Sequence, residues 1–245
     1  MQILTYLTYI FELLPFLLCV IFLKKMFNTK EGKAFLFYSL VYGIFIILLL
    51  FFRYYLVSGI KASSILKRAV LIFEFPLLCN YFFNVLVNKK VKYFFIFATI
   101  FFTFFSFYDY YTSTERQNNF FPLAIECLFF ILIIIYYFYE KIQFSLLTPI
   151  YLSMNFWVST GLLLYFSGNF FLFLYSKTAE KNDVFKLQFN LVYDVFTITK
   201  DILLCIAVVI NYYSVSVISK LNLPTEANVF LDSFSPINKK TTPNP

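Results

Sequence analysis

The sequence predicts an all-α fold: a polytopic membrane protein whose seven transmembrane helices form a bundle with short loops. Three observations predict this class. The chain of 245 residues is 61% hydrophobic and only 13% charged, whereas a soluble domain is about 45–50% apolar and about 25% charged. The apolar residues fall into separate blocks whose lengths suit a bilayer crossing, which takes about 20 residues. The Lys and Arg residues gather in the short segments between these blocks.

The seven blocks are expected to form one membrane domain over residues 1–219. The first block lacks the basic start and the small-residue cleavage site of a signal peptide, so we expect it to remain as a span. The fourth block is the shortest, and tyrosines at both of its ends are expected to anchor it at the membrane surfaces. Residues 220–245 are polar and proline-containing, which predicts a disordered cytoplasmic tail. The predicted spans are 2–23, 35–53, 69–88, 93–108, 119–139, 148–176 and 187–219.

The composition argues against a metal or cofactor site. The chain contains no histidine, which is the commonest metal ligand, and its four cysteines lie in four different blocks without a Cys-x-x-Cys pair. We therefore expect no metal, no cofactor and no disulfide framework. The 37 Phe and 20 Tyr residues are interpreted as the effect of an AT-rich genome rather than as an aromatic binding cage. No nucleic-acid partner is expected.

Five carboxylates lie inside the first, third, fifth and seventh blocks. If all seven blocks are spans, these four helices run in the same direction, so the acids are expected to share one layer in the outer half of the membrane. Ionisable groups are costly in a membrane and usually face the bundle interior, where they pair. The expected counter-ions are Arg53 at the end of the second block and Lys67 and Arg68 at the start of the third. Pro15, Pro76 and Pro122 accompany the three glutamates and are expected to free backbone carbonyls nearby. The five acids are Glu12, Glu74, Glu126, Asp194 and Asp201.

The last block opens with a polar stripe that Lys200 flanks. Two alternatives remain for its depth. A span that begins near Leu187 buries these charges deeply, whereas a span that begins near Ile202 leaves them at the membrane surface. The position of Lys200 also resembles that of the retinal-binding lysine of a rhodopsin, but no other feature of the sequence matches that family. The stripe consists of Asn190, Asp194, Thr197 and Asp201, which follow each other at three- and four-residue steps.

The sixth block carries small residues on one helix face. Gly161 and Gly168 are seven residues apart, and Thr160 and Ser167 lie beside them with the same spacing. Small residues let membrane helices approach closely, so this face is expected to pack against a neighbouring helix. The alternative is that it lines a cavity into which Asn155 and Asn169 point.

The sixth block also carries a pattern, F-W-x3-G-L-x2-Y-F-S-G over residues 156–168. This pattern resembles the sixth span of a family of small, largely uncharacterised bacterial seven-helix inner-membrane proteins. The pair Glu74-Phe75, the early Glu126 of the fifth block and the Glu-Leu-Leu-Pro stretch at 12–15 are similar to that family as well. The resemblance covers roughly residues 1–215 and implies a seven-helix fold in a bacterial inner membrane. It implies no activity.

The acidic layer predicts a sensor-like or ligand-binding membrane protein with an acidic cavity, acting through a partner. The alternatives are a proton-coupled transporter, an intramembrane lipid hydrolase with paired carboxylates, and a structural role in which the acids only hold helices together. No catalytic residue is assigned, and whether the chain is an enzyme is left open. Besides the bilayer, the expected partners are a small molecule or lipid and another membrane protein or a second copy. The expected ligand-binding residues are Glu12, Glu74, Glu126, Arg53, Asp194, Asp201, Lys200 and Asn169.

The distribution of Lys and Arg residues predicts the orientation, because these residues are enriched in cytoplasmic segments. The strongly basic first connection favours an N-terminus outside and a tail in the cytoplasm. Reporter fusions after Leu23, Asn88 and Lys220 are expected to report the cytoplasm, and a fusion after Phe52 is expected to report the outside. Cytoplasmic reporter activity of the fusion after Phe52 would contradict this orientation.

Overall fold

The computed structural model describes residues 2–55, 59–112, 121–144, 150–174 and 183–218, and this part of the chain is helical and contains no strand. The predicted tail at 220–245 lies outside the described residues. Besides the short α2 (Leu23–Met26) and η1 (Ile150–Leu152), the long helices are α1 (Gln2–Ile21), α3 (Lys30–Tyr55), α4 (Gly59–Val85), α5 (Lys89–Thr112), α6 (Phe121–Phe144), α7 (Met154–Leu174) and α9 (Asp183–Ile218).

Each predicted block has its counterpart in one long helix, but α3, α4, α5 and α9 begin earlier than their blocks. In α3 and α5 a polar side chain caps the first turn. Thr29 Oγ1 accepts a hydrogen bond of 3.0 Å from the Gly32 amide. Asn88 Oδ1 accepts one of 3.0 Å from the Lys90 amide. Such caps satisfy backbone N–H groups that have no partner within the helix. A hydropathy pattern does not reveal these caps, so the predicted blocks for α3 and α5 started too late.

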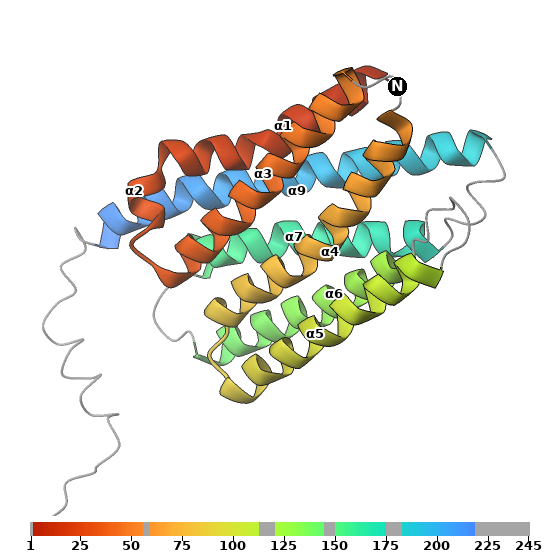
Figure 1. The fold of residues 1–245 in the computed structure, drawn as a ribbon. Helices are drawn as coiled ribbons and strands as arrows, with labels where there is room; N and C mark the ends of the chain where they lie inside the picture. The colour runs from red at the N-terminus through yellow and green to blue at the C-terminus, as the bar shows by residue number, and fades with distance from the viewer. Residues whose placement is uncertain (1, 56–58, 113–120, 145–149, 175–182, 219–245) are drawn as a thin grey trace, which may run out of the picture.

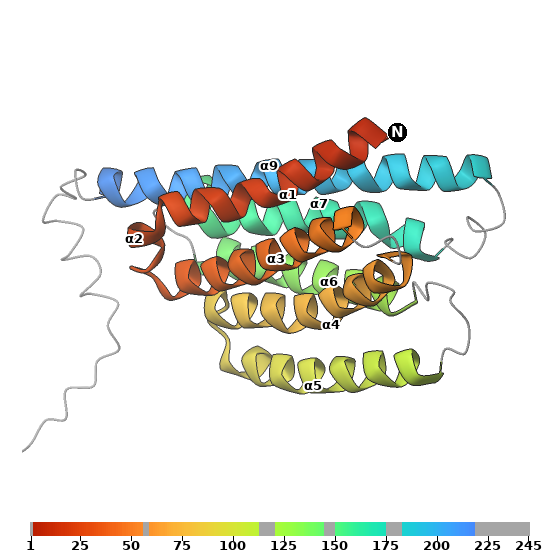
Figure 2. The ribbon, with the colours of Figure 1, turned by 45° about the horizontal axis from the view of Figure 1, so that its top comes forward.

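The long helices form a bundle in which neighbours in the chain run in opposite directions. Helix α9 packs between α1 and α7, α1 also packs on α3, and α3 packs on α4. On the other side, α6 packs on α7 and α5 packs on α4. The colours in Figures 1 and 2 show that α1, α4, α6 and α9 run one way while α3, α5 and α7 run the other way. The acid-bearing helices therefore run in the same direction, as expected from the sequence.

The surface and the helix lengths indicate a membrane protein. Four helices of the described part are long and apolar enough to cross a membrane. Their outer faces expose large apolar side chains, and on α5 the rings of Phe97, Phe101 and Phe104 are 65–72% exposed. Lipid is the medium in which such a surface is stable. A count of seven spans stays a prediction. The four helices cover Lys30–Phe52, Lys89–Asp109, Pro122–Gln143 and Met154–Leu174.

A cluster of phenylalanine rings joins α4, α5, α6 and α7. The ring of Phe75 stacks on that of Phe102 with centroids 3.9 Å apart, and it lies 5.2 Å from the ring of Phe130. Phe130 in turn stacks on Phe166 at 5.0 Å. Stacked rings contribute packing beyond the area they bury. This apolar half of the bundle holds α6 and α7 in place beside the charged helix α9.

Close packing of α7 on α9 depends on the two glycines of α7. A Cβ atom on Gly161 would lie 3.1 Å from Leu203 Cβ and 3.3 Å from the Lys200 carbonyl oxygen. A Cβ atom on Gly168 would lie 2.5 Å from the Phe196 ring. These contacts confirm that the glycines face a neighbouring helix. Ser167 is exposed, so the small residues do not all share this interface.

Larger side chains at these glycines are expected to destabilise the protein. Gly161→Leu and Gly168→Leu overpack the contact with α9 and should each lower the free energy of unfolding by about 1–3 kcal/mol. Ser167→Leu is the matched control, since the same side chain there points outward. Unfolding in detergent, followed by thermal or denaturant titration, measures the difference. Equal stability of all three variants would show that α7 and α9 do not pack closely.

Candidate functional site

A lysine and an aspartate lie midway along α9 and point into the bundle. Because α9 extends from Asp183 to Ile218, Lys200 and Asp201 are far from both of its ends. Lys200 is fully buried and Asp201 is 1% exposed. Both side chains therefore lie well within the helix and inside the bundle. The residue at which a membrane span begins on α9 stays a prediction. The burial of two charged side chains inside an apolar bundle needs a physical explanation.

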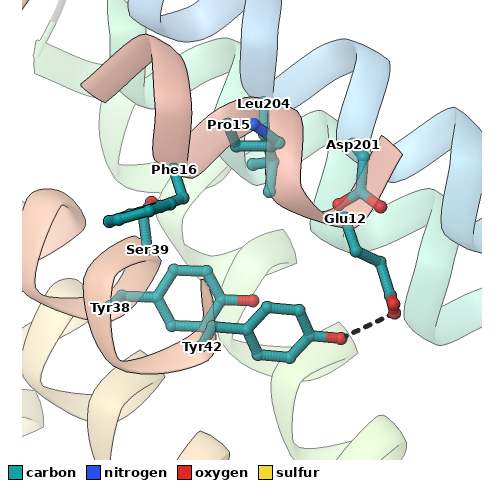
Figure 3. Close-up of a pocket in the computed structure, with 8 residues that line it drawn as sticks. All are labelled: Glu12, Pro15, Phe16, Tyr38, Ser39, Tyr42, Asp201 and Leu204. Atoms are coloured by element: carbon teal, nitrogen blue, oxygen red, sulfur yellow. Dashed lines mark hydrogen bonds between the residues drawn. The ribbon is translucent and has the colours of Figure 1, made fainter. Parts of the chain in front are cut away.

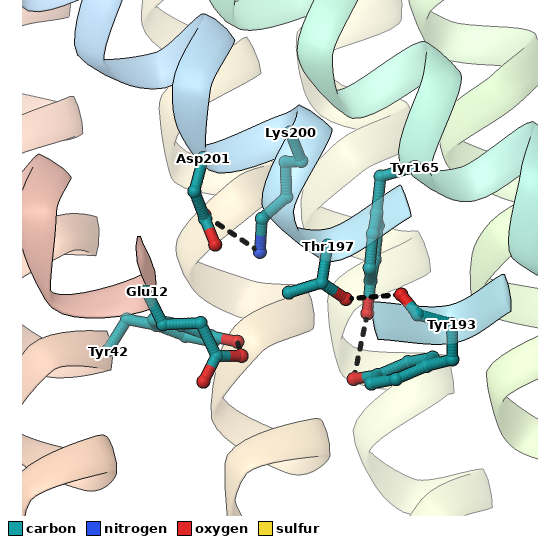
Figure 4. A network of polar contacts seen from close by, with 7 residues as sticks. All are labelled: Glu12, Tyr42, Tyr165, Tyr193, Thr197, Lys200 and Asp201. Atoms are coloured by element: carbon teal, nitrogen blue, oxygen red, sulfur yellow. Dashed lines mark hydrogen bonds and ion pairs between the residues drawn. The ribbon is translucent and has the colours of Figure 1, made fainter. Parts of the chain in front are cut away.

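The ammonium group of Lys200 is surrounded by one carboxylate and two aromatic rings (Figure 4). Its Nζ atom lies 3.4 Å from Asp201 Oδ1, which is an ion pair but does not meet hydrogen-bond geometry. The same atom lies 5.0 Å from the centre of the Tyr42 ring and 4.7 Å from that of Tyr165. A cation over an aromatic face is stabilised by the negative charge of the ring face.

Acidic side chains from three further helices complete the surroundings. Glu12 on α1 accepts a 3.0 Å hydrogen bond from the Tyr42 hydroxyl and interacts electrostatically with Lys200 and Asp201. Glu74 on α4 also interacts with Lys200 and Asp201, and Glu126 on α6 interacts with Glu74. All three glutamates are buried. The Lys200 cluster, as we name it, consists of Lys200, Asp201, Glu12, Glu74, Glu126, Tyr42 and Tyr165.

Many polar atoms of the Lys200 cluster have no hydrogen-bond partner among the described residues. They include Lys200 Nζ, Asp201 Oδ2, Glu74 Oε1 and both carboxylate oxygens of Glu126. Buried polar groups in proteins are nearly always hydrogen-bonded, and each exception has a cost of about 1–3 kcal/mol, more for a charged group. These atoms without partners make the Lys200 cluster the candidate functional site.

Glu74 and Asp201 lie deeper in their helices than the sequence predicted, because α4 begins ten residues and α9 four residues before the predicted blocks. Glu12 is near the middle of α1, as its predicted block implied, and Glu74 is near the middle of α4. Pro15 and Pro76 lie inside these two helices, as expected. Pro122 is different: it is the second residue of α6, where the N–H group would have no helical partner anyway, so it frees no carbonyl beside Glu126.

The other predicted site residues lie outside the cluster or outside the described part. Asp194 is buried about two turns before Asp201, roughly 10 Å along α9. Asn169 is fully buried one turn beyond Tyr165 on α7, and its amide group finds no hydrogen-bond partner among the described residues. The side chain of Arg53 lies outside the described residues, so its role as counter-ion stays a prediction.

Sequence reasoning missed the tyrosines of this site. Tyr42 and Tyr165 cover the ammonium group, and Tyr38, one turn before Tyr42 on the same face of α3, interacts electrostatically with Glu74 and Asp201. The interpretation of the tyrosine content as compositional was wrong for these residues. The available signal was Tyr38-Ser39 followed by Tyr42 inside an apolar block, because a hydroxyl group in a membrane helix needs a partner.

A small cavity borders the cluster between α1, α3 and α9 (Figure 3). Its volume is about 10 Å³, which is about the room for one water molecule. Polar side chains from all three helices line it together with three apolar ones. The lining residues are Glu12, Pro15, Phe16, Tyr38, Ser39, Tyr42, Asp201 and Leu204.

One more buried carboxylate, Glu140 on α6, lies outside the cluster. Its two oxygens accept hydrogen bonds of 3.0 Å from the Val87 amide and 2.9 Å from the Asn88 amide. It therefore caps the turn that leads into α5, which is a structural role. The predicted fifth block ended at residue 139, so Glu140 was not among the carboxylates expected inside the blocks.

Within the described residues, no three His, Cys, Asp or Glu side chains are grouped to hold a metal ion. The cysteines are free thiols.

No protein-family model, curated protein or solved structure matches the chain. The function is therefore argued from the Lys200 cluster itself.

The ion pair between Lys200 and Asp201 is expected to show strong coupling. Asp201→Asn leaves the buried ammonium without its nearest anion and should destabilise the protein by about 3–5 kcal/mol. Adding Lys200→Met removes the unpaired charge and should restore much of that loss. Denaturant titration of the two single variants and the double variant measures the coupling. Additive effects would mean that the two groups do not interact.

Proposed function

We propose that the chain is a seven-span, sensor-like membrane protein that binds a proton or a small cation at the Lys200 cluster. Its resemblance to the bacterial seven-helix family places it, in this proposal, in the inner membrane. The distribution of Lys and Arg residues supports an N-terminus outside and a tail in the cytoplasm. The observation that carries the proposal is the fully buried Lys200 surrounded by acids from other helices. Intramembrane ionisable groups that face a bundle interior commonly serve ion or proton binding.

The charges of the cluster support a cationic ligand. It holds four carboxylates, from Glu12, Glu74, Glu126 and Asp201, against the single ammonium group of Lys200. Three uncompensated negative charges in an apolar bundle would be very costly. The cluster therefore reaches low energy only when it takes up protons or a cation. Its occupancy then follows the proton or cation concentration, which is the basic requirement for a sensor.

The helices that carry the cluster are suited to move when its charge changes. Pro15 lies three residues after Glu12 on α1, and Pro76 lies two residues after Glu74 on α4. A proline inside a helix removes one backbone hydrogen bond and eases bending at that point. We infer that a change of charge at either glutamate alters the bend of its helix. The described residues form no domain outside the bundle, so the response would pass to a partner membrane protein or a second copy.

A proton-coupled transporter is the second candidate, favoured by the same two prolines beside acids in the middle of α1 and α4. The two functions differ in whether the bound ion crosses the membrane. A lipid hydrolase is less well supported, because the cavity of about 10 Å³ beside Glu12 and Asp201 has no room for a lipid group. Ion flux into proteoliposomes that contain the purified protein separates the transporter from the sensor.

The proposal is tested by a pH titration of the purified protein in lipid nanodiscs. Trp157 is the only tryptophan of the chain and lies one turn before Gly161, which packs on α9 at Lys200. Its indole N–H donates to the Tyr151 carbonyl just before α7, so its fluorescence is expected to change when this end of α7 moves. The wild type should show a reversible fluorescence transition with pH, because the cluster gains or loses protons.

Variants of matched size decide which acid is responsible. Glu74→Gln removes an ionisable group from the cluster and should abolish or shift the transition by at least tenfold in proton concentration. Glu140→Gln removes a buried carboxylate outside the cluster and should leave the transition unchanged. A wild-type curve without a transition, or one that Glu74→Gln does not alter, would refute the proposal.

A further inference from the structure

We infer that the cavity between α1, α3 and α9 is a binding site for one sodium ion. This inference rests on the proposed function and names its ligand. The cavity borders the Lys200 cluster at Glu12 and Asp201, and its other polar walls come from α3. An ion bound there would contact three helices at once, so its binding would favour one arrangement of these helices over others.

The oxygen atoms around the cavity are the ligands that a hard cation prefers. Carboxylate groups come from Glu12 and Asp201, and hydroxyl groups come from Tyr38, Ser39 and Tyr42. Asp201 Oδ2, Tyr38 Oη and Ser39 Oγ are buried and have no hydrogen-bond partner among the described residues. Unpartnered oxygens from two different helices that line one cavity indicate an occupant that accepts their lone pairs.

Two neighbouring groups do not satisfy these hydroxyl groups. The Glu74 carboxylate lies near the Tyr38 hydroxyl, and the Cys19 thiol lies near the Ser39 hydroxyl. Neither contact meets hydrogen-bond geometry, since both hydroxyl oxygens remain without a partner. The third hydroxyl, that of Tyr42, already donates to Glu12 at 3.0 Å, but its oxygen keeps a lone pair for a cation.

The charge at the cavity selects a monovalent cation. Two carboxylates, those of Glu12 and Asp201, border it, and the ammonium group of Lys200 pairs with Asp201 Oδ1. With Glu12 ionised, one negative charge is left uncompensated at the cavity. A single positive charge cancels it, whereas a divalent ion would leave an excess positive charge beside Lys200, and an anion would be repelled. A proton on Glu12 would compete with the ion for the same negative charge.

The size of the cavity favours a small ion. Its volume of about 10 Å³ is about the room for one water molecule, so it admits one monatomic ion and excludes a larger organic cation. Phe16 and Leu204 form apolar walls and limit access of bulk water, so an ion here exchanges its hydration shell for protein oxygens. An ordered water molecule would fit the same volume, and the experiment separates the two.

The test compares the melting temperature of the purified protein in NaCl, KCl and choline chloride at equal ionic strength, with binding of radioactive sodium as a direct measure. NaCl is expected to raise the melting temperature over both other salts, because a ligand that binds only the folded state stabilises it. Tyr38→Phe and Ser39→Ala each remove one hydroxyl group and should weaken sodium binding by at least tenfold. The matched controls are Tyr137→Phe and Ser106→Ala, which remove buried, unpartnered hydroxyl groups away from the cavity.

Equal melting temperatures in the three salts, with no bound radioactive sodium, would show that the cavity holds water and would overturn the inference. If Tyr38→Phe fails to fold, Ser39→Ala alone decides the role of the hydroxyl groups. Sodium binding that neither variant weakens would also overturn it. The pH transition of Trp157 is measured in sodium-free buffer, so the proposed function stands or fails independently of the sodium result.

Discussion

The buried positive charge of Lys200 is the constraint on which the rest of this bundle depends. An unpaired ammonium group in an apolar interior costs several kcal/mol. Asp201, its neighbour in the chain, supplies one anion at 3.4 Å, but the remaining faces of the ammonium group must be covered from other helices. Glu12 and Glu74 bring negative charge from α1 and α4, and the rings of Tyr42 and Tyr165 cover the ammonium group from α3 and α7. Five helices thus each contribute a charged or aromatic side chain to the surroundings of this one ammonium group.

The packing of α7 on α9 serves this same requirement. Gly161 allows the backbone of α7 to approach the carbonyl group of Lys200 itself. Tyr165 follows one turn later on the same face, and the close approach is what brings its ring to 4.7 Å from Lys200 Nζ. A larger residue at position 161 would move α7 outward and carry the ring away from the charge. The small residues of the sixth block were predicted only to allow close helix packing. Gly161 also helps to position the Tyr165 ring over the ammonium group of Lys200.

The fold was largely predictable from the sequence, because seven apolar blocks with charged connections leave few alternatives. The helix ends could not be predicted, since caps such as Thr29 and Asn88 act through single hydrogen bonds that a hydropathy pattern does not reveal. The acids were found because a carboxylate in an apolar block is conspicuous. Their partners were not, because Tyr42 and Tyr165 count as apolar in any block pattern and only three-dimensional packing brings their rings to Lys200. The burial of Lys200 could not be predicted either, because it depends on how α9 packs against α1 and α7.

The composition of the cluster favours the proposed ligand over a purely structural role. Buried networks that only hold helices together are satisfied, with each donor matched to an acceptor. Here the charges are unequal, and Glu126 keeps two oxygens without a hydrogen bond among the described residues. Glu12, Glu74 and the Lys200–Asp201 pair come from three different helices and are all buried. Charges that are buried in three helices and still have atoms without hydrogen-bond partners among the described residues are better explained by a ligand that completes them.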